Sequence, residues 1–285
     1  MFLTLGNPGL SDFYIDFLGQ IRHDVKYPSL AILAHSHIGH DARVATLEDA
    51  LSLKDQVEAT CATLDQIRRA FPEPVSIFLM GHSIGSWICM QVMKDRSDTV
   101  HTMFALFPTV SNIKNTPNGR KLSVRPTFMG SADMLTHSQW FFNPPLPSLV
   151  SSLCRLVAPT CPFLLPILFW HWPSHQREII QQLIKSPSSV FAALTMAHDE
   201  MQTVKALDVQ ILDELKSRIK WLYGFVDEWV GIHGDELVRH LGREVAAQNT
   251  RYADLPHAFC IRESLRTLQG IFIINEGFSA QQRNS

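Results

Sequence analysis

In the stretch VSIFLMGHSIG, residues 75–85, an apolar run leads directly into a serine that lies between two glycines. The run is typical of a buried strand, and the residues that follow, 84–93, have the pattern of a helix. A strand that turns sharply into a helix around such a serine is the arrangement of a nucleophile elbow. Only small residues fit two positions before and after the serine, because strand and helix pass close together. The predicted elbow is the nucleophile Ser83 with its neighbours Gly81, His82, Ile84 and Gly85.

The rest of the chain alternates short apolar runs with helical patterns on either side of one long interruption. This alternation predicts an α/β fold, with a mostly parallel sheet covered by helices on both faces. The interruption, 111–215, is rich in proline and apolar residues, so we expect a large apolar helical cap inserted into a single domain, 1–285, with its core at 1–110 and 216–285. Strands are predicted at 2–5, 29–35, 75–80, 100–107, 219–225 and 250–253, and helices at 13–25, 47–70, 84–93, 233–248 and 261–275.

Composition excludes several classes of protein. The 285 residues are enough for one large α/β domain. The net charge of −2 gives no indication of a nucleic-acid partner. The five cysteines form no CxxC pair, which disfavours a disulfide framework or a zinc site and favours a reducing compartment. No basic segment precedes an apolar one at the start of the sequence, so we expect a protein that is not secreted.

A serine nucleophile needs a base, and the base needs an acid, which in α/β-hydrolases follow in the order serine, acid, histidine. The segment LPHAF places His257 after a predicted strand, where the base belongs, although a structural histidine is the alternative. The segment LYGFVDEWV places Asp227 just past the end of another predicted strand. Asp133, in MGSADML, also follows a strand-like segment. We prefer Asp227, because Asp133 would require the insertion to begin only after it.

Two backbone N–H groups are expected to stabilise the oxyanion. Ile84 lies at the predicted helix N-terminus, where its N–H is free and the helix dipole favours negative charge. The second donor should come from GNPG, residues 6–9, in the loop after the first strand. Pro8 has no N–H, so the N–H of Asn7 is the candidate. The alternative is that GNPG forms a simple turn.

The segment HSHIGH contains three histidines that could suggest a metal site. No second cluster of histidines or carboxylates supports such a site. We therefore expect no metal and no cofactor, and a structural role in the loop for His35, His37 and His40.

Several motifs occur together in one order, namely GNPG, SHIGH, GHSIG, FPTV with PNGR, YGFVD and PHAF. In this combination the chain resembles the lipid droplet-associated hydrolase family, closely over 5–125 and 215–265 and loosely between them. The resemblance implies a serine hydrolase of lipid esters, such as sterol esters or acylglycerols, with a role in lipid storage or turnover. It also implies a location at the lipid droplet surface and at the endoplasmic reticulum. By similarity, the nucleophile, acid and base are Ser83, Asp227 and His257.

Members of this family carry two further strands before the strand that ends in GNPG, whereas this sequence begins inside that strand. In the α/β-hydrolase order these strands lie beside the predicted strand at 29–35. We therefore expect this apolar strand to form an edge of the sheet, where its backbone groups are open to pairing.

Residues 146–170, LPSLVSSLCRLVAPTCPFLLPILFW, carry a single charge, on Arg155. The length fits a membrane-spanning helix of about 20 residues, but three prolines would break a straight one. Two apolar pieces around a proline-rich turn favour a hairpin that enters a droplet monolayer or the membrane of the endoplasmic reticulum. The alternative is a cap that packs over an acyl pocket. The prolines are Pro159, Pro162 and Pro166, and the flanking anchors are Trp140, Trp170 and Trp172.

Three functions remain open at this stage. The ordered set of serine, acid and histidine and the apolar insertion favour a lipid-ester hydrolase. The alternatives are a catalytically weak droplet-binding protein with a hydrolase fold and a soluble short-chain carboxylesterase.

Overall fold

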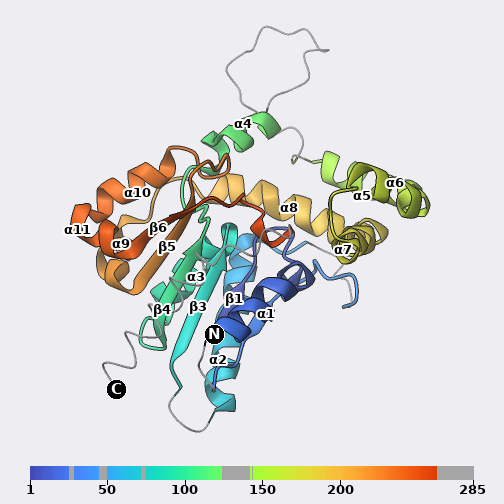
Figure 1. Cartoon of the computed structure of the whole chain (residues 1–285). Helices are drawn as coiled ribbons and strands as arrows, with labels where there is room; N and C mark the ends of the chain where they lie inside the picture. The colour runs from blue at the N-terminus through green and yellow to red at the C-terminus, as the bar shows by residue number, and fades with distance from the viewer. Residues whose placement is uncertain (26–28, 45–49, 72–74, 124–141, 143, 262–285) are drawn as a thin grey trace, which may run out of the picture.

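The six strands of the structure form one parallel sheet in the order β2-β1-β3-β4-β5-β6 (Figure 1). All six predicted strands are present, and the parallel sheet of the predicted α/β fold is confirmed. The strands are β1 (Phe2–Thr4), β2 (Leu33–His35), β3 (Ile77–His82), β4 (Val100–Leu106), β5 (Ile219–Gly224) and β6 (Thr250–Ala253). This computed structural model describes residues 1–25, 29–44, 50–71, 75–123, 142 and 144–261.

The sheet is buried on both faces, because alternate residues of a strand point to opposite sides. On β3, Ile77 and Leu79 lie in one apolar cluster, and Phe78 and Met80 lie in the other. The first cluster includes residues of α2 and α3, and the second includes residues of α1. The helices of the core are α1 (Ile15–Asp24) with the 3-10 helix η1 (Ser11–Tyr14) before it, α2 (Leu53–Ala70), α3 (Ile84–Asp95), α10 (His233–Leu241) and α11 (Arg243–Asn249).

The single helix predicted at 233–248 is wrong. Gly242 interrupts it at φ +78°, a conformation that ends α10 and starts α11 in a new direction. Of the helix predicted at 47–70, residues 47–49 lie outside the described residues, and α2 begins at Leu53, where Ser52 and Asp55 form a capping box. The helix predicted at 261–275 lies outside the described residues, apart from Ile261 at the end of the 3-10 helix η5 (Phe259–Ile261).

Between β4 and β5 the described residues form helices and loops. Figure 1 shows α8 crossing above the carboxyl ends of the strands, with α5 packed on it. The carboxyl ends are where parallel α/β sheets place their functional residues. The helices are α4 (Pro117–Ser123), α5 (Leu146–Val157), α6 (Cys161–Leu168), α7 (Ser174–Lys185), α8 (Pro187–Thr203) and α9 (Val209–Leu215), with 3-10 helices η2 (Ile113–Asn115), η3 (Ala158–Thr160) and η4 (Lys216–Arg218).

The hairpin expected within 146–170 is wrong, because α5, the 3-10 helix η3 and α6 follow one another with no non-helical turn between them. Pro159 and Pro162 are the second residues of η3 and α6, in the first turn, where a proline is tolerated. Pro166 lies inside α6 and is tolerated there. By length and composition, this 23-residue helix could cross a membrane.

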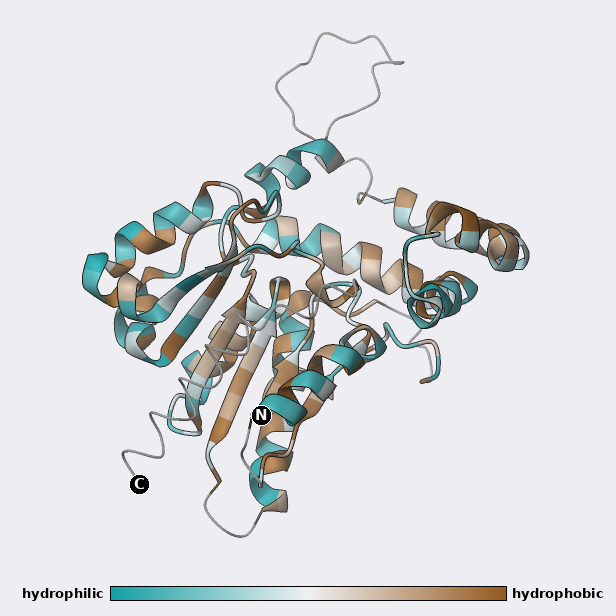
Figure 2. Ribbon diagram, in the orientation of Figure 1, coloured by the Kyte–Doolittle hydropathy of each residue, from teal (hydrophilic) through white to brown (hydrophobic). Residues whose placement is uncertain are grey.

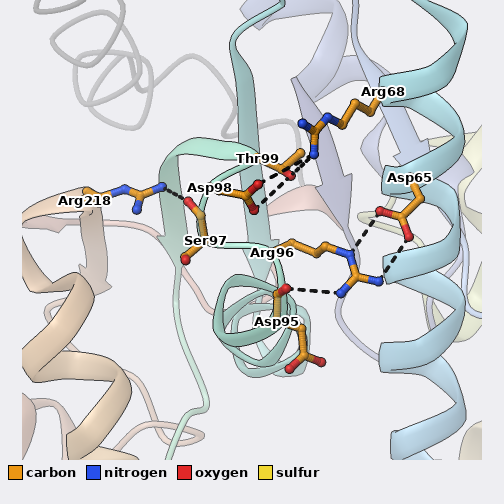
Figure 3. Close-up of polar contacts among 8 residues, drawn as sticks. All are labelled: Asp65, Arg68, Asp95, Arg96, Ser97, Asp98, Thr99 and Arg218. Carbon is orange, nitrogen blue, oxygen red and sulfur yellow. Dashed lines mark hydrogen bonds and ion pairs between the residues drawn. The ribbon is translucent and has the colours of Figure 1, made fainter.

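Polar contacts join α2, α3 and the strands at the amino ends of β4 and β5, opposite the carboxyl ends of the strands (Figure 3). Arg96, just after α3, donates two hydrogen bonds of 3.1 Å to the carboxylate of Asp65 on α2. Arg68 on α2 donates to the Thr99 hydroxyl at 3.1 Å, and Arg218 donates to the Ser97 carbonyl at 2.5 Å. These bonds connect α2, the α3–β4 loop and the segment before β5.

The turn from β3 into α3 holds Ser83 at φ 54° and ψ −125°, outside the regions that non-glycine residues ordinarily adopt. Two glycines allow this turn. A Cβ on Gly85 would collide with the backbone carbonyl of Thr4 on β1, and one on Gly81 would collide with the carbonyl of Gly85. The expectation that only small residues fit at these two positions is therefore confirmed.

Substitution of Gly85 by alanine tests this close packing. Because the colliding atom is backbone, β1 or α3 must move, and we expect Gly85→Ala to lower the free energy of unfolding by about 1–3 kcal/mol. Gly19→Ala is the matched control, because Gly19 is exposed on α1 and a Cβ there meets nothing within 4 Å. It should raise the same free energy by about 0.5–1 kcal/mol. Urea unfolding measures both, and equal effects would contradict the packing argument.

Candidate active site

Three predicted side chains meet at the carboxyl edge of the sheet. The Nε2 atom of His257 lies 2.9 Å from Oγ of Ser83, and its Nδ1 atom lies 2.8 Å from Oδ2 of Asp227. Ser83 follows β3, Asp227 lies in the loop after β5, and His257 lies in the loop after β6. These are the distances at which a base can accept a proton from a nucleophile while an acid orients the base.

The carboxylate of Asp227 is almost enclosed, with 3% of its side chain exposed. Its Oδ1 atom accepts hydrogen bonds from the backbone N–H groups of Trp229 and Val230, at 2.9 and 3.3 Å. Its Oδ2 atom is then left to accept from Nδ1–H of His257. The loop after β5 therefore fixes the carboxylate in the orientation that selects one tautomer of His257.

The two predicted oxyanion donors belong to the start of α3 and to the loop after β1. Ile84 is the first residue of α3, so its N–H has no partner within its own helix. Asn7 lies in the loop after β1, and its side chain forms hydrogen bonds with α8. Its Nδ2 atom donates to the carbonyl of Ala193 at 2.9 Å and to Oε1 of Glu200 at 3.0 Å.

Glu200, which the sequence analysis did not single out, is a buried acid beside this loop. Burial raises the pKa of Glu200 to about 8, the amide of Asn7 opposes this shift, and the neighbouring Asp199 adds to it. The carboxyl group is therefore mostly protonated at neutral pH. Because 193 positions separate Glu200 from Asn7, no local sequence pattern indicates the contact.

Tyr14 is a second residue whose role sequence reasoning missed. Its hydroxyl lies 2.6 Å from Nδ1 of His82 and accepts a hydrogen bond from the N–H of Gly6 at 3.1 Å. The one signal in the sequence was that Tyr14 closely follows GNPG. That position does not indicate a contact with His82, which lies 68 positions further along the chain.

The histidines of HSHIGH pack beside the GNPG loop. The Nδ1–H group of His40 donates to the carbonyl of Pro8 at 2.8 Å, and the rings of His37 and His40 meet edge to face. Burial lowers the pKa of His40 to about 4 and lowers the pKa of His37 well below its ordinary value. Within the described residues, no group of three or more His, Cys, Asp or Glu could hold a metal ion. Asp133, the alternative acid, lies outside them.

The pKa of Glu200 gives the stability of the protein a pH dependence. Between the ordinary pKa of about 4.5 and the folded value of about 8, the folded state binds the proton and the unfolded state does not. Stability should therefore fall as pH rises through this window. Glu200→Gln keeps an acceptor for Asn7 and removes the titration, so we expect a higher Tm than wild type at pH 8 and nearly the same Tm at pH 5. Thermal unfolding measures this difference.

The control for this prediction is Glu214→Gln, because Glu214 lies exposed on α9. It should leave the Tm difference between pH 5 and pH 8 unchanged. If the Tm of Glu200→Gln equals that of wild type at both pH 5 and pH 8, Glu200 is ionised in the folded state at pH 8 and the prediction is wrong.

Comparison with known proteins identifies relatives of this chain. The family described as Lipid-droplet associated hydrolase matches residues 1–260. A lipid droplet-associated hydrolase of Drosophila melanogaster is 27% identical over 275 residues, covering 91% of this chain and 83% of that protein. The corresponding protein of Rattus norvegicus is 27% identical over 282 residues, covering 92% and 79%.

The solved structures that resemble this chain are α/β-hydrolases. A peroxisomal alpha-beta-hydrolase of Saccharomyces cerevisiae superposes with a TM-score of 0.61 at 13% identity, covering 99% of this chain and 75% of that one. A haloalkane dehalogenase variant from Bradyrhizobium elkanii superposes with a TM-score of 0.64 at 11% identity, and the match covers 100% of this chain and 91% of that one. At such identities the likeness establishes the α/β-hydrolase fold alone. The match along residues 1–260 establishes more: the chain belongs to the lipid-droplet associated hydrolase family.

Proposed function

We propose that this hydrolase cleaves carboxylic esters of lipids through an acyl-enzyme intermediate on Ser83. The observation that carries the proposal is the continuous chain of hydrogen bonds from Asp227 through His257 to Ser83, at 2.8 and 2.9 Å. The strained elbow under Ser83 and the order of the three residues along the chain support it. The cap, 111–215, is proposed to cover the site and shape its substrate pocket.

In the first half of the reaction, Oγ of Ser83 attacks the ester carbonyl carbon while Nε2 of His257 takes the hydroxyl proton. Asp227 stabilises the imidazolium that forms. The N–H groups of Asn7 and Ile84 donate to the oxyanion of the tetrahedral intermediate, and such a donor is typically worth about 2.7–4 kcal/mol of barrier. The intermediate then collapses, the alcohol leaves with the proton from His257, and the acyl group stays on Ser83.

In the second half, a water molecule replaces the alcohol. His257 takes one proton from the water as its oxygen attacks the acyl carbon, and a second tetrahedral intermediate forms. Its collapse breaks the bond to Oγ, returns the proton to Ser83 and releases the carboxylic acid. The enzyme ends in its starting state, and no group beyond the three side chains, the two amides and water takes part in these steps.

The outer face of α5 and α6 supports a lipid surface as the place of action. Figure 2 shows these two helices as an apolar projection beside the domain. Exposed apolar patches of this extent mark interaction sites, and the relatives are named for lipid droplets. We propose that this face rests in the droplet monolayer, and association with the endoplasmic reticulum remains an expectation. Its exposed side chains include Leu149, Leu153, Leu156, Phe163, Ile167 and Trp170.

The arrangement of α5 and α8 supports delivery of a lipid ester from the surface to the site. The helix α5 packs on α8, and α8 in turn contacts Asn7 beside the elbow. The helices α5 and α8 therefore lie between the proposed lipid-contacting face and the loop of Asn7.

Replacement of the proposed nucleophile and acid tests the chemistry. The wild-type protein should react with a fluorophosphonate and hydrolyse p-nitrophenyl esters, whereas Ser83→Ala should do neither. Asp227→Asn should lower kcat by about 10⁴-fold, because the amide no longer fixes the tautomer of His257. Asp254→Asn, at an exposed aspartate before His257, is the control and should retain wild-type rates. Equal labelling of wild type and Ser83→Ala would exclude Ser83 as the nucleophile.

Replacement of exposed apolar residues by glutamate tests the lipid contact. The double variant Leu153→Glu/Phe163→Glu should lose most of its binding to artificial droplets, because these side chains, 55% and 75% exposed, would bring charge into the acyl layer. Val209→Glu is the control, since Val209 is 49% exposed on α9. Flotation with phospholipid-coated triacylglycerol droplets measures binding. Unchanged flotation of the double variant would exclude this face, and droplet binding without ester turnover by the wild type would favour a droplet-binding protein.

A further inference from the structure

His82, the residue before the proposed nucleophile, is buried and bonded at both ring nitrogens. Its Nδ1 atom lies 2.6 Å from the hydroxyl of Tyr14, and its Nε2 atom lies 2.9 Å from the backbone carbonyl of His257. The rings of Phe107 and Phe259 enclose it edge to face. A buried histidine with two defined partners has a fixed orientation, which a histidine packed only for its shape would not need.

The partners determine the direction of every hydrogen bond in this network. A carbonyl oxygen can only accept, so Nε2 of His82 carries the proton that is donated to His257. The Nδ1 atom of the neutral ring must then accept, so the hydroxyl of Tyr14 donates to it. That hydroxyl oxygen accepts in turn from the N–H of Gly6 at 3.1 Å. The side chain of Cys260 also interacts with this hydroxyl, so Tyr14 contacts Gly6, His82 and Cys260.

The network joins three segments that are distant in sequence and that each supply a part of the proposed site. Gly6 precedes the oxyanion candidate Asn7 in the loop after β1. His82 precedes Ser83 in the elbow. The carbonyl of His257 belongs to the residue whose ring is the proposed base. A shift of the Tyr14 hydroxyl or of the His82 ring would therefore change how the oxyanion loop and the base lie relative to Ser83.

We propose that Tyr14 and His82 are positioning residues, which hold the loop of Asn7 and the loop of His257 in register with Ser83. This inference rests on the proposed function, because it assigns these residues to the geometry of that reaction. Neither residue is a catalytic group here: each acts through the backbone of a neighbour. Misplacement of reacting groups by about 1 Å can cost about 100-fold in rate, which is the effect such residues prevent.

The ring of His82 must stay neutral for this role, and its surroundings favour the neutral form. Burial, together with the nearby ring of His257, lowers the pKa of His82 to about 3, although the hydrogen bond to the backbone of His257 and the charge of Asp227 act in the opposite sense. Tyr14 and Cys260 are uncharged, since burial raises the pKa of Cys260 to about 12 and raises that of Tyr14 well above its ordinary value. A neutral ring also places no positive charge beside the imidazolium that His257 becomes.

Substitution of Tyr14 by phenylalanine removes only the bridging hydroxyl. The rate of Ser83 phosphonylation by a fluorophosphonate, measured well below each unfolding midpoint, should fall about 10- to 100-fold in Tyr14→Phe. The KM for a p-nitrophenyl ester should change little, because Tyr14 is buried, with 3% of it exposed. Tyr252→Phe is the matched control, because Tyr252 is 43% exposed on β6, and it should react as wild type does.

The outcomes separate this inference from the proposed function. A wild-type protein that is not labelled overturns the proposed function and this inference with it. A labelled wild type with an equally fast Tyr14→Phe overturns this inference and leaves the function intact. If Tyr14→Phe does not fold, His82→Gln and His82→Leu replace it, because glutamine can still donate to the carbonyl of His257 and leucine cannot. We expect the labelling rate to be highest in wild type, lower in His82→Gln and lowest in His82→Leu. Equal rates for the two variants would overturn the inference.

The ¹⁵N chemical shifts of the His82 ring provide a direct check on the wild-type protein. The network requires a protonated Nε2 and an unprotonated Nδ1 from pH 5 to pH 8, a signature that simple packing of the ring would not require. Protonation of Nδ1 anywhere in this range overturns the inference.

Discussion

Ser83 is held at φ 54° and ψ −125°, a conformation that costs a non-glycine residue about 1–3 kcal/mol. The surrounding structure maintains this strain. The N–H of Ser83 donates to the carbonyl of Leu106 on β4, and its own carbonyl accepts from Ser86 and Thr109. Gly85 lets α3 start directly against β1. The central strands therefore fix the hydroxyl of Ser83 in space, and the loops after β1, β5 and β6 need only arrange their own groups around this point.

Much of this arrangement could be predicted from the sequence, because the signals are local. Apolar runs predicted all six strands, and the GHSIG segment with chain order predicted which acid and which histidine meet Ser83. The contacts that could not be predicted join residues far apart. The bond from Asn7 to Glu200 spans 193 positions, and the contact of Tyr14 with His82 spans 68. The break between α10 and α11 at Gly242 could not be predicted either. The helical periodicity continues across this glycine, and only its φ ends the helix.

The helix from Leu146 to Leu168 shows how position decides the effect of proline. Counting prolines predicted a hairpin, since proline ordinarily ends a helix. In the structure Pro159 and Pro162 each lie in the first turn of a new helical piece, so α5, η3 and α6 follow one another without a loop between them. The two α-helices form an apolar projection beside the domain (Figure 2). Within this projection α5 packs on α8, whereas α6 contacts α7.

The strand β6 pairs only with β5, so within the described residues it forms one edge of the sheet. His257 follows this strand by a few residues, whereas Ser83 leaves the sheet near its centre. Edge strands open more readily than central ones, often without the rest of the molecule unfolding. Detachment of β6 would move His257 away from Ser83 without breaking the pairing of β1, β3 and β4. The 2.9 Å contact between His257 and Ser83 therefore depends on the edge of the sheet, whereas the position of Ser83 itself depends on the centre of the sheet.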